Sequence, residues 1–161
     1  MIGAIVVLAL VTAQRLGELV LARRNTARLL ARGGVEHGAA HYPVIVALHA
    51  AWLAGLWVLA WDRPVHAGWL GAYLVLQGLR AWVLLSLGSR WTTRIITLPG
   101  ETLVRRGPYR FVPHPNYLVV AGEIAVLPLV FGLPLYALAF SALNAVVLAI
   151  RIRAETRALR G

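Results

Sequence analysis

The run V-I-V-A-L-H-A-A-W-L-A-G-L-W-V-L-A-W, residues Val44–Trp61, contains no arginine, lysine, aspartate or glutamate. An α-helix rises about 1.5 Å per residue, so a run of this length reaches most of the way across the ~30 Å hydrocarbon core of a bilayer. Pro43 precedes the run, and the turn-like segment Trp61-Asp62-Arg63-Pro64 closes it. The run therefore predicts a membrane-spanning helix.

Four further apolar runs lie before and after this one along the chain. They are Ile2–Ala22, Gly68–Gly88, Tyr117–Phe131 and Leu133–Ile150. The last two are separated only by Gly132, and Pro134 follows closely, which favours a tight helical hairpin. Because the fourth run is short, this hairpin can be tilted or can cross only part of the bilayer.

The composition supports the same fold class. The chain has 161 residues, of which 60% are hydrophobic and 14% are charged, whereas a soluble domain carries about a quarter charged residues. Its mean hydropathy is +0.73. We predict an all-α integral membrane protein with five transmembrane helices, the last two forming the C-terminal hairpin. Residues 1–161 should form one domain, with three helices in 1–88 and the loop, hairpin and basic tail in 89–161.

The basic residues are all arginine, and they are unevenly distributed. Thirteen of the sixteen fall in Arg23–Arg32, Arg90–Arg110 and Arg151–Arg160, which follow the first, third and fifth runs. Five spans place these segments on one membrane face, and the positive-inside rule assigns that face to the cytoplasm. Because the formal charge of +10 lies between apolar runs, we expect the bilayer's anionic lipid headgroups as its counterions and no nucleic-acid partner.

The chain contains no cysteine, which excludes a disulfide, a thiolate nucleophile and a cysteine-ligated metal. We expect no metal site. The first run has no basic leader or small-residue cleavage site, so it is expected to be retained as a helix. It contains Arg15 and Glu18, which lie three residues apart on one helical face and can pair with each other.

Polar residues inside the other runs are functional candidates, because ionisable groups are costly in hydrocarbon. Gln77 and Arg80 are also three residues apart, and the Arg80 side chain is long enough to reach toward the membrane face. We expect His49 to be a hydrogen-bonded packing residue and Asn144 to bond a neighbouring helix. Glu123 has no partner nearby in the sequence, so it can meet an arginine or the amine of a ligand.

The most unusual polar segment is Glu101–Tyr117, which reads E-T-L-V-R-R-G-P-Y-R-F-V-P-H-P-N-Y. Its three prolines prevent a continuous helix. Non-helical backbone at a membrane must line a cavity or be buried in protein. A proline-framed loop that carries Tyr109, His114 and Tyr117 suits a flat, polar ligand, although an ordered connector without a ligand is the alternative.

The basic tail contains a second candidate pair at the end of the fifth run. Arg151 and Glu155 are four residues apart and therefore share a helical face. An arginine can hold a carboxylate through two parallel hydrogen bonds, and a glutamate can accept from an ammonium or hydroxyl group. The alternative is a solvated ion pair between the two side chains.

These two segments together resemble a known family of membrane enzymes. The motif G-P-Y-R-x-x-x-H-P-x-Y at Gly107–Tyr117, followed by a short helical hairpin and R-I-R-x-E at Arg151–Glu155, is similar to the isoprenylcysteine carboxyl methyltransferase family. The resemblance is strongest over Arg90–Leu159. The earlier segments Arg15–Leu19 and Arg24-Asn25 look like the small bacterial branch of this family, some members of which are associated with polyketide-type lipids.

The resemblance implies a methyltransferase that uses S-adenosylmethionine without a Rossmann domain. The cofactor would enter from the cytoplasmic side of a bacterial inner membrane, and a lipophilic small-molecule or prenylated substrate would enter from the bilayer. The cofactor-binding residues that the resemblance implies are Glu101, Thr102, Leu103, Val104, Tyr109, His114, Pro115, Asn116, Tyr117 and Glu155.

The implied catalytic residues are Arg151, Glu155 and His114. The resemblance favours methyl transfer to the carboxylate of an isoprenylcysteine-like or other lipidic acceptor, with Arg151 facing the reacting group. A carboxylate is anionic at neutral pH and needs no general base. If the acceptor is a phenol or enol of a polyketide-type lipid, Glu123 or His114 would assist its deprotonation. Arg151 and Glu123 are therefore the predicted substrate-binding residues.

The sequence departs from the family pattern at three positions. Pro113 stands where the family usually has arginine, Glu101 stands where it often has histidine, and Thr156 stands where it has a second acid. These departures affect the contacts to the cofactor and the choice of acceptor.

Two other classes of function remain open from the sequence. A methyltransferase of a phospholipid amine could use much the same cofactor motif. A transporter or membrane scaffold would use the charges within the helices as a permeation path, but transporters commonly contain repeated halves with broken helices. The chain contains no such repeat.

Overall fold

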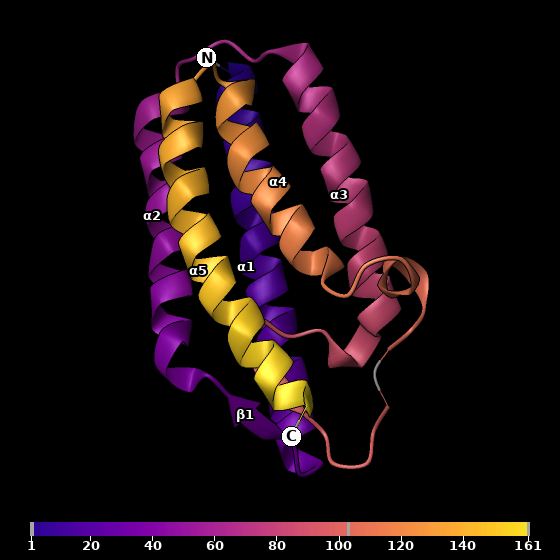
Figure 1. Cartoon of the computed structure of the whole chain (residues 1–161). Coiled ribbons are helices and arrows are strands. Elements are labelled where there is room, and N and C mark those ends of the chain that lie inside the picture. Colours follow the sequence, from indigo (N-terminus) through magenta and orange to yellow (C-terminus); the bar gives the residue numbers. More distant parts are fainter. Residues whose placement is uncertain (1, 103, 161) are drawn as a thin grey trace.

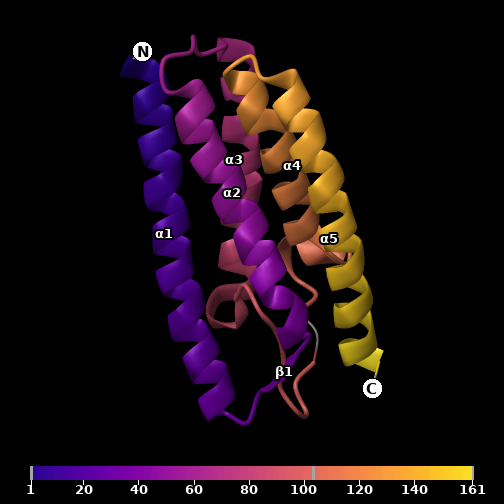
Figure 2. The same ribbon diagram turned by 90° about the vertical axis from the view of Figure 1, so that its left-hand side faces the viewer.

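Five helices run side by side in the computed structural model, which describes residues 2–102 and 104–160 (Figures 1 and 2). The helices are α1 Ile2–Ala31, α2 Tyr42–Ala60, α3 Ala67–Leu87, α4 Pro115–Val130 and α5 Pro134–Arg160. The N-terminus and the end of α5 lie at opposite ends of the bundle (Figure 1). Each of the five apolar runs therefore forms the helix that the sequence predicts.

Four of the described helices are long and apolar enough to cross a membrane. These are α1, α2, α3 and α5, whereas α4 is apolar but has only 16 residues. This length and composition agree with the predicted all-α membrane protein, with four candidate spans where the sequence predicts five. The short α4 packs between α3 and α5, as expected for the first half of a hairpin.

The main hydrophobic core lies where four helices meet. Trp52 and Leu56 of α2, Leu8 of α1 and Leu127 of α4 are almost completely buried, and Phe131 closes the core after α4. Half of the residues of α4 are buried, and they point toward both of its neighbours. A short helix is stabilised in this position because protein, rather than lipid, covers most of its surface.

One segment that the sequence assigns to a connection between helices is helical in the structure. The predicted end of the first helix at Ala22 is wrong, because α1 continues to Ala31. Nothing between these residues breaks a helix, and Gly33 with a φ of 84° follows its end. The arginines of this segment therefore extend from a helix. The basic tail after Ile150 continues α5, in agreement with the helical face predicted for Arg151 and Glu155.

The other unpredicted feature is a small antiparallel sheet at the end of the bundle near the end of α5. It pairs β1, Val35–His37, with β2, Ile95–Thr97. Arg94 Nη1 donates to Glu36 Oε1 over 2.7 Å across this pair. The sheet ties the segment after α1 to the segment after α3. Because each strand has only three residues, the fold as a whole remains all-α.

Three single-turn 3₁₀ helices complete the regular structure of the described residues. They are η1 Ala39–His41, η2 Gly88–Arg90 and η3 Gly107–Arg110. The last of these begins at Gly107, which has a φ of 59° and lies so close to α3 that a Cβ would overlap Ser86 Oγ. Arg106 Nε also donates to the Ser86 carbonyl over 2.7 Å. Glycine is therefore what allows the proline-rich loop to approach α3.

Replacing Gly107 by alanine should test this close approach. Gly100 is a matched control, because it has a φ of 77° but no neighbour within 4 Å of an added Cβ. Both changes carry the strain of a positive φ, and only Gly107→Ala adds overlap with Ser86. We expect Gly107→Ala to lower the free energy of unfolding by about 2 kcal/mol more than Gly100→Ala does. Denaturant titration of both variants would measure this, and equal losses would contradict the close approach.

Candidate functional site

The proline-rich loop and the last turns of α5 lie against each other. His114 Nδ1 lies 3.3 Å from Glu155 Oε2, and Arg151 Nε donates to Tyr117 Oη over 3.0 Å. The rings of His114 and Tyr117 stack with centroids 5.5 Å apart. Four residues that the sequence singles out in two distant segments are thus brought together.

Arg151 is fixed by contacts to two other segments. Its side chain is buried, with 6% exposure, and a second nitrogen, Nη2, donates to the Thr93 carbonyl. In the described part of the chain, Arg151 bonds Tyr117 and Thr93 and forms no ion pair with Glu155. The solvated Arg151–Glu155 pair that the spacing allows is therefore not formed.

Tyr109 of η3 lies near Glu155. It packs on the cluster of Trp91, Val83 and Val119, so η3 is held between α3 and α4. Burial raises the pKa of the Tyr109 phenol, and the negative charge of Glu155 raises it further. Tyr109 is therefore neutral at physiological pH and can donate a hydrogen bond, but it does not act as a phenolate base.

Two acceptor oxygens in this group are incompletely satisfied. Asn116 Oδ1 is buried without a hydrogen bond from any described residue, and buried Glu155 Oε2 has only its 3.3 Å contact with His114 Nδ1. Unpaired buried acceptors are costly, so such atoms indicate a missing donor. A ligand that carries positive charge or several N–H or O–H groups would satisfy both oxygens.

The earlier part of the predicted cofactor segment has different partners. Glu101 pairs with Arg32 at the end of α1 and with Arg90 of η2. Arg90 Nη1 also donates to the Thr102 carbonyl over 2.7 Å. Thr102 and Val104 line a separate hollow beside Arg90, and Leu103 lies outside the described residues. The predicted cofactor residues therefore form two groups, and His114, Tyr117 and Glu155 belong to the group at α5.

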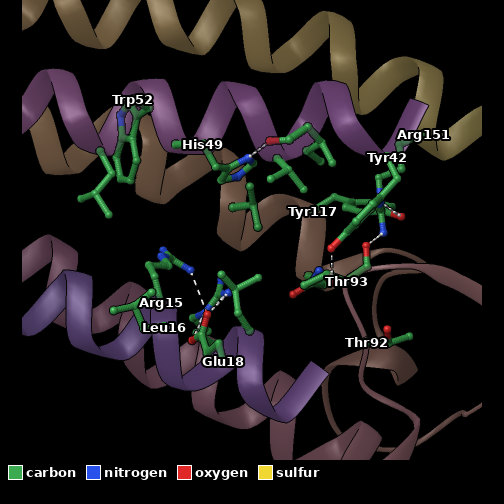
Figure 3. A pocket seen from close by; sticks show the side chains of 18 of the residues that line it. Arg15, Leu16, Glu18, Tyr42, His49, Trp52, Thr92, Thr93, Tyr117 and Arg151 are labelled. Carbon is green, nitrogen blue, oxygen red and sulfur yellow. Dashed lines mark hydrogen bonds and ion pairs between the residues drawn. The ribbon is translucent and has the colours of Figure 1, made fainter. Parts of the chain in front are cut away.

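A cavity of about 310 Å³ extends from Tyr117 and Arg151 into the helix bundle (Figure 3). At this end its lining also includes Tyr42, Thr93 and Asn116. The walls are mostly apolar and come from α1, α2, α4 and α5. The residues of these walls are Leu16, Leu19, Ile45, Val46, Ala50, Leu53, Val120 and Leu148. Such a lining with a few convergent polar groups is typical of a ligand site.

The predicted site residue Glu123 lies in an ion-pair network and does not line this cavity. It is 1% exposed and contacts Arg15 Nη2 over 2.8 Å and Arg80 Nη1 over 2.9 Å. Gln77 also donates to it over 2.8 Å. The predicted pair of Arg15 with Glu18 is present at 3.2 Å. The sequence shows no partner for Glu123 nearby, and the structure provides two, Arg15 of α1 and Arg80 of α3.

The two remaining polar candidates within the helices, His49 and Asn144, differ in their hydrogen bonding. His49 Nδ1 bonds the Ile45 carbonyl over 2.8 Å, which confirms a hydrogen-bonded histidine, and the side chain also lines the cavity. The side-chain oxygen of Asn144 is buried and has no hydrogen-bond partner among the described residues. The predicted bond from Asn144 to a neighbouring helix is therefore not made through this oxygen.

Two residues of the site carry no signal in the sequence. Tyr42 Oη lies 3.0 Å from Thr93 Oγ1, and the Arg94 guanidinium lies 4.5 Å from the centre of the Tyr42 ring. The Thr93 carbonyl holds Arg151. A tyrosine at a helix start and a threonine in a loop have no distinctive spacing, so only the fold reveals them.

Comparison with known proteins shows the family to which the chain belongs. The family model of the isoprenylcysteine carboxyl methyltransferase family matches residues 69–161, which include α4, α5 and the proline-rich loop. The chain is 39% identical over 158 residues to the uncharacterized protein YpbQ of Bacillus subtilis, which covers 95% of this chain and 94% of that protein.

A second relative is more distant. An uncharacterized protein of Haemophilus influenzae is 25% identical over 166 residues, which covers 94% of this chain and 91% of that protein. No solved structure matches the chain significantly. The family model spans more than half of the chain, and the relative from Bacillus subtilis spans nearly all of it. The chain therefore belongs to the isoprenylcysteine carboxyl methyltransferase family.

Proposed function

We propose that this protein is an S-adenosylmethionine-dependent O-methyltransferase that acts on the carboxylate of an isoprenylcysteine-like or other lipidic acceptor. The observation that carries the proposal is the position of Arg151 and Tyr117. They line one end of a largely apolar cavity and contact each other beside His114 and Glu155. A lipid in the cavity and a polar cofactor at the loop would thus meet at this pair.

The residues at the end of α5 fit the proposed cofactor. S-adenosylmethionine carries a sulfonium, an ammonium and two ribose hydroxyls. It therefore offers a donor to Asn116 Oδ1 and positive charge to Glu155, whose Oε2 otherwise contacts only His114 Nδ1. Neutral Tyr109 would donate to an acceptor atom of the same ligand. When bound, the cofactor supplies an activated methyl group.

The remaining predicted cofactor residues are assigned to the same site by family resemblance. Glu101 is paired with Arg32 and Arg90, so a role for it in cofactor binding would include these arginines. Leu103 and Pro115 complete the set together with the neighbouring backbone. Under this proposal the loop from Glu101 to Tyr117 closes over one side of the cofactor.

The chain's own contribution to the reaction is alignment. The buried Arg151 would hold the acceptor carboxylate through parallel hydrogen bonds, and Tyr117 fixes the arginine. The cavity walls would exclude water and hold the chain of the lipid. Bringing two reactants into register can lower a barrier by about 7–11 kcal/mol, which suits a reaction whose methyl donor is already activated. His114 is the candidate base for a phenol or enol acceptor.

We also propose the orientation of the site. If α4 together with the four longer helices crosses the bilayer, five spans place the arginine-rich ends of α1 and α5 and the segment after α3 on one face. The positive-inside rule then assigns the candidate site to the cytoplasmic face of a bacterial inner membrane. S-adenosylmethionine is made in the cytoplasm, so this orientation gives the site access to it.

The most direct test is incubation of the purified protein and bacterial membrane lipids with isotope-labelled S-adenosylmethionine. Mass spectrometry should then detect a labelled methyl ester on a lipid carboxylate. A label on a phenol or enol would identify a polyketide-type lipid as the acceptor. A label on an amine headgroup would identify a phospholipid amine as the acceptor. Failure to bind S-adenosylmethionine at any practical concentration would refute the proposed enzyme.

Glu155→Gln tests the cofactor site separately from turnover. The substitution keeps the size of the side chain and removes its negative charge, so we expect calorimetric affinity for S-adenosylmethionine to fall about tenfold. Asp62→Asn is the matched control, because Asp62 is exposed in the turn after α2 at the opposite end of the bundle. Unchanged affinity in Glu155→Gln would remove Glu155 from the site.

A further inference from the structure

The inner end of the cavity is polar, unlike its walls. Arg15, Glu18 and Arg80 line it, and Figure 3 shows Arg15 and Glu18 on α1 facing His49 on α2. Charged side chains inside a membrane protein are costly and commonly mark a substrate path. A cluster that served only to clamp helices together would not need to border a cavity.

The charges of this cluster cancel one another. Arg80 Nε donates to Glu18 Oε1 over 2.6 Å, and both Arg15 and Arg80 contact Glu123. Two arginines thus pair with two glutamates, and Gln77 also donates a hydrogen bond to Glu123. Because the cluster has no net charge, it offers little attraction to an ionic headgroup. A neutral polar group is the ligand that it suits.

Two residues at this end of the cavity each have a hydrogen-bonding atom that no described residue contacts. Arg15 Nε is buried and has no hydrogen-bond partner among the described residues. His49 Nδ1 bonds the Ile45 carbonyl, which can only accept, so Nδ1 carries the proton and Nε2 of the neutral ring is an acceptor. One donor on α1 and one acceptor on α2 match a hydroxyl group, which both accepts and donates.

We propose that the acceptor lipid carries a neutral hydroxyl group in its chain, and that this group docks between Arg15 and His49. The inference rests on the proposed function, since it places the reacting oxygen at Arg151. Tyr42 lines the Arg151 end of the cavity, and His49 lies two helical turns further along α2. The hydroxyl would therefore lie roughly 10 Å from the reacting carboxylate. Arg15 and His49 then determine which lipids the cavity accepts.

The test compares two fatty acids in the full-length protein in lipid nanodiscs. One is octadecanoate, and the other is the same acid with a hydroxyl placed roughly 10 Å from the carboxylate along the chain. Their affinities are measured by tryptophan fluorescence, because Trp52 and Trp91 line the cavity. We expect the hydroxylated acid to bind the unmodified protein about tenfold more tightly.

Two variants remove the proposed donor and acceptor in different ways. His49→Phe deletes the ring nitrogens, and Arg15→Lys keeps the positive charge but removes Nε. Each should reduce the tenfold preference to less than about twofold. His66→Phe is the matched control, because His66 is exposed in the connection between α2 and α3 and should leave the preference intact. Arg15→Lys still tests the inference if His49→Phe does not fold.

The outcome is independent of methyl transfer, because the titration contains no S-adenosylmethionine. Equal binding of the two acids by the unmodified protein would overturn this inference and leave the methyltransferase proposal standing. A preference that survives in both variants would overturn it as well. A preference that both variants abolish would support it even in a protein that failed to bind S-adenosylmethionine, and that failure would count against the methyltransferase proposal alone.

Discussion

Replacing Arg151 by alanine is expected to reduce methyl transfer to a carboxylate lipid by about 10²- to 10³-fold, the loss typical of removing one preorganised donor. The reason for this loss is the position of the Arg151 side chain. Arg151 is buried, is held by Tyr117 and the Thr93 carbonyl, and lines the cavity. Calorimetric affinity for S-adenosylmethionine should stay within about threefold, because Glu155 and Asn116 remain in place. Rates with labelled cofactor and a lipid carboxylate would measure the loss.

Two further variants sharpen this test. Arg151→Lys keeps the charge but loses the planar fork that holds a carboxylate at two points, so it should recover only part of the rate. Arg157→Ala removes an exposed arginine from the same helix and should leave the rate unchanged. If Arg151→Ala lost cofactor binding as its main effect, Arg151 would belong to the cofactor site and not to the acceptor site.

Replacing Glu123 by glutamine should be the most damaging single change to stability. It leaves Arg15 and Arg80 without the carboxylate that both contact, and an unpaired buried charge costs about 3–5 kcal/mol. The network joins α1, α3 and α4, so the loss should loosen the packing of α4. Unfolding by titration with a denaturing detergent would give the change in free energy.

A second substitution separates lost charge balance from lost packing. Combining Glu123→Gln with Arg15→Met restores equal numbers of positive and negative side chains, so the double variant should recover part of the loss. Glu36→Gln is the control, because Glu36 pairs with Arg94 near the membrane face with partial exposure of both side chains. A cost below about 1 kcal/mol for Glu123→Gln, the level of an exposed pair, would show that the network contributes little.

The helices could be predicted because their signal is local. Runs such as Val44–Trp61 and Gly68–Gly88 are long, apolar and bounded by turn residues, and each forms a helix close to its predicted ends. The end of α1 was less predictable, because the arginines after Ala22 mark where a helix leaves hydrocarbon, not where it ends. The β1–β2 pair was not predictable, since three-residue strands are stabilised by a partner about 60 residues away.

The candidate site could be predicted only in part for a similar reason. His114, Tyr117, Arg151 and Glu155 stand out by residue type and spacing, and the fold brings them together. The position of Glu101 beside Arg32 and Arg90 depends on how the loop folds back over the end of α3. The spacing of residues along the chain does not predict how this loop folds back.

The sequence by itself determined that this protein is helical and membrane-embedded, and which family it resembles, because hydrophobic runs and short motifs are properties of neighbouring residues. Tertiary structure alone decided which side chains share a cavity. Glu123 finds its arginines on α1 and α3, and Arg151 finds a carbonyl at Thr93. These contacts form between residues more than 40 positions apart, where helix packing, not local preference, sets the distance.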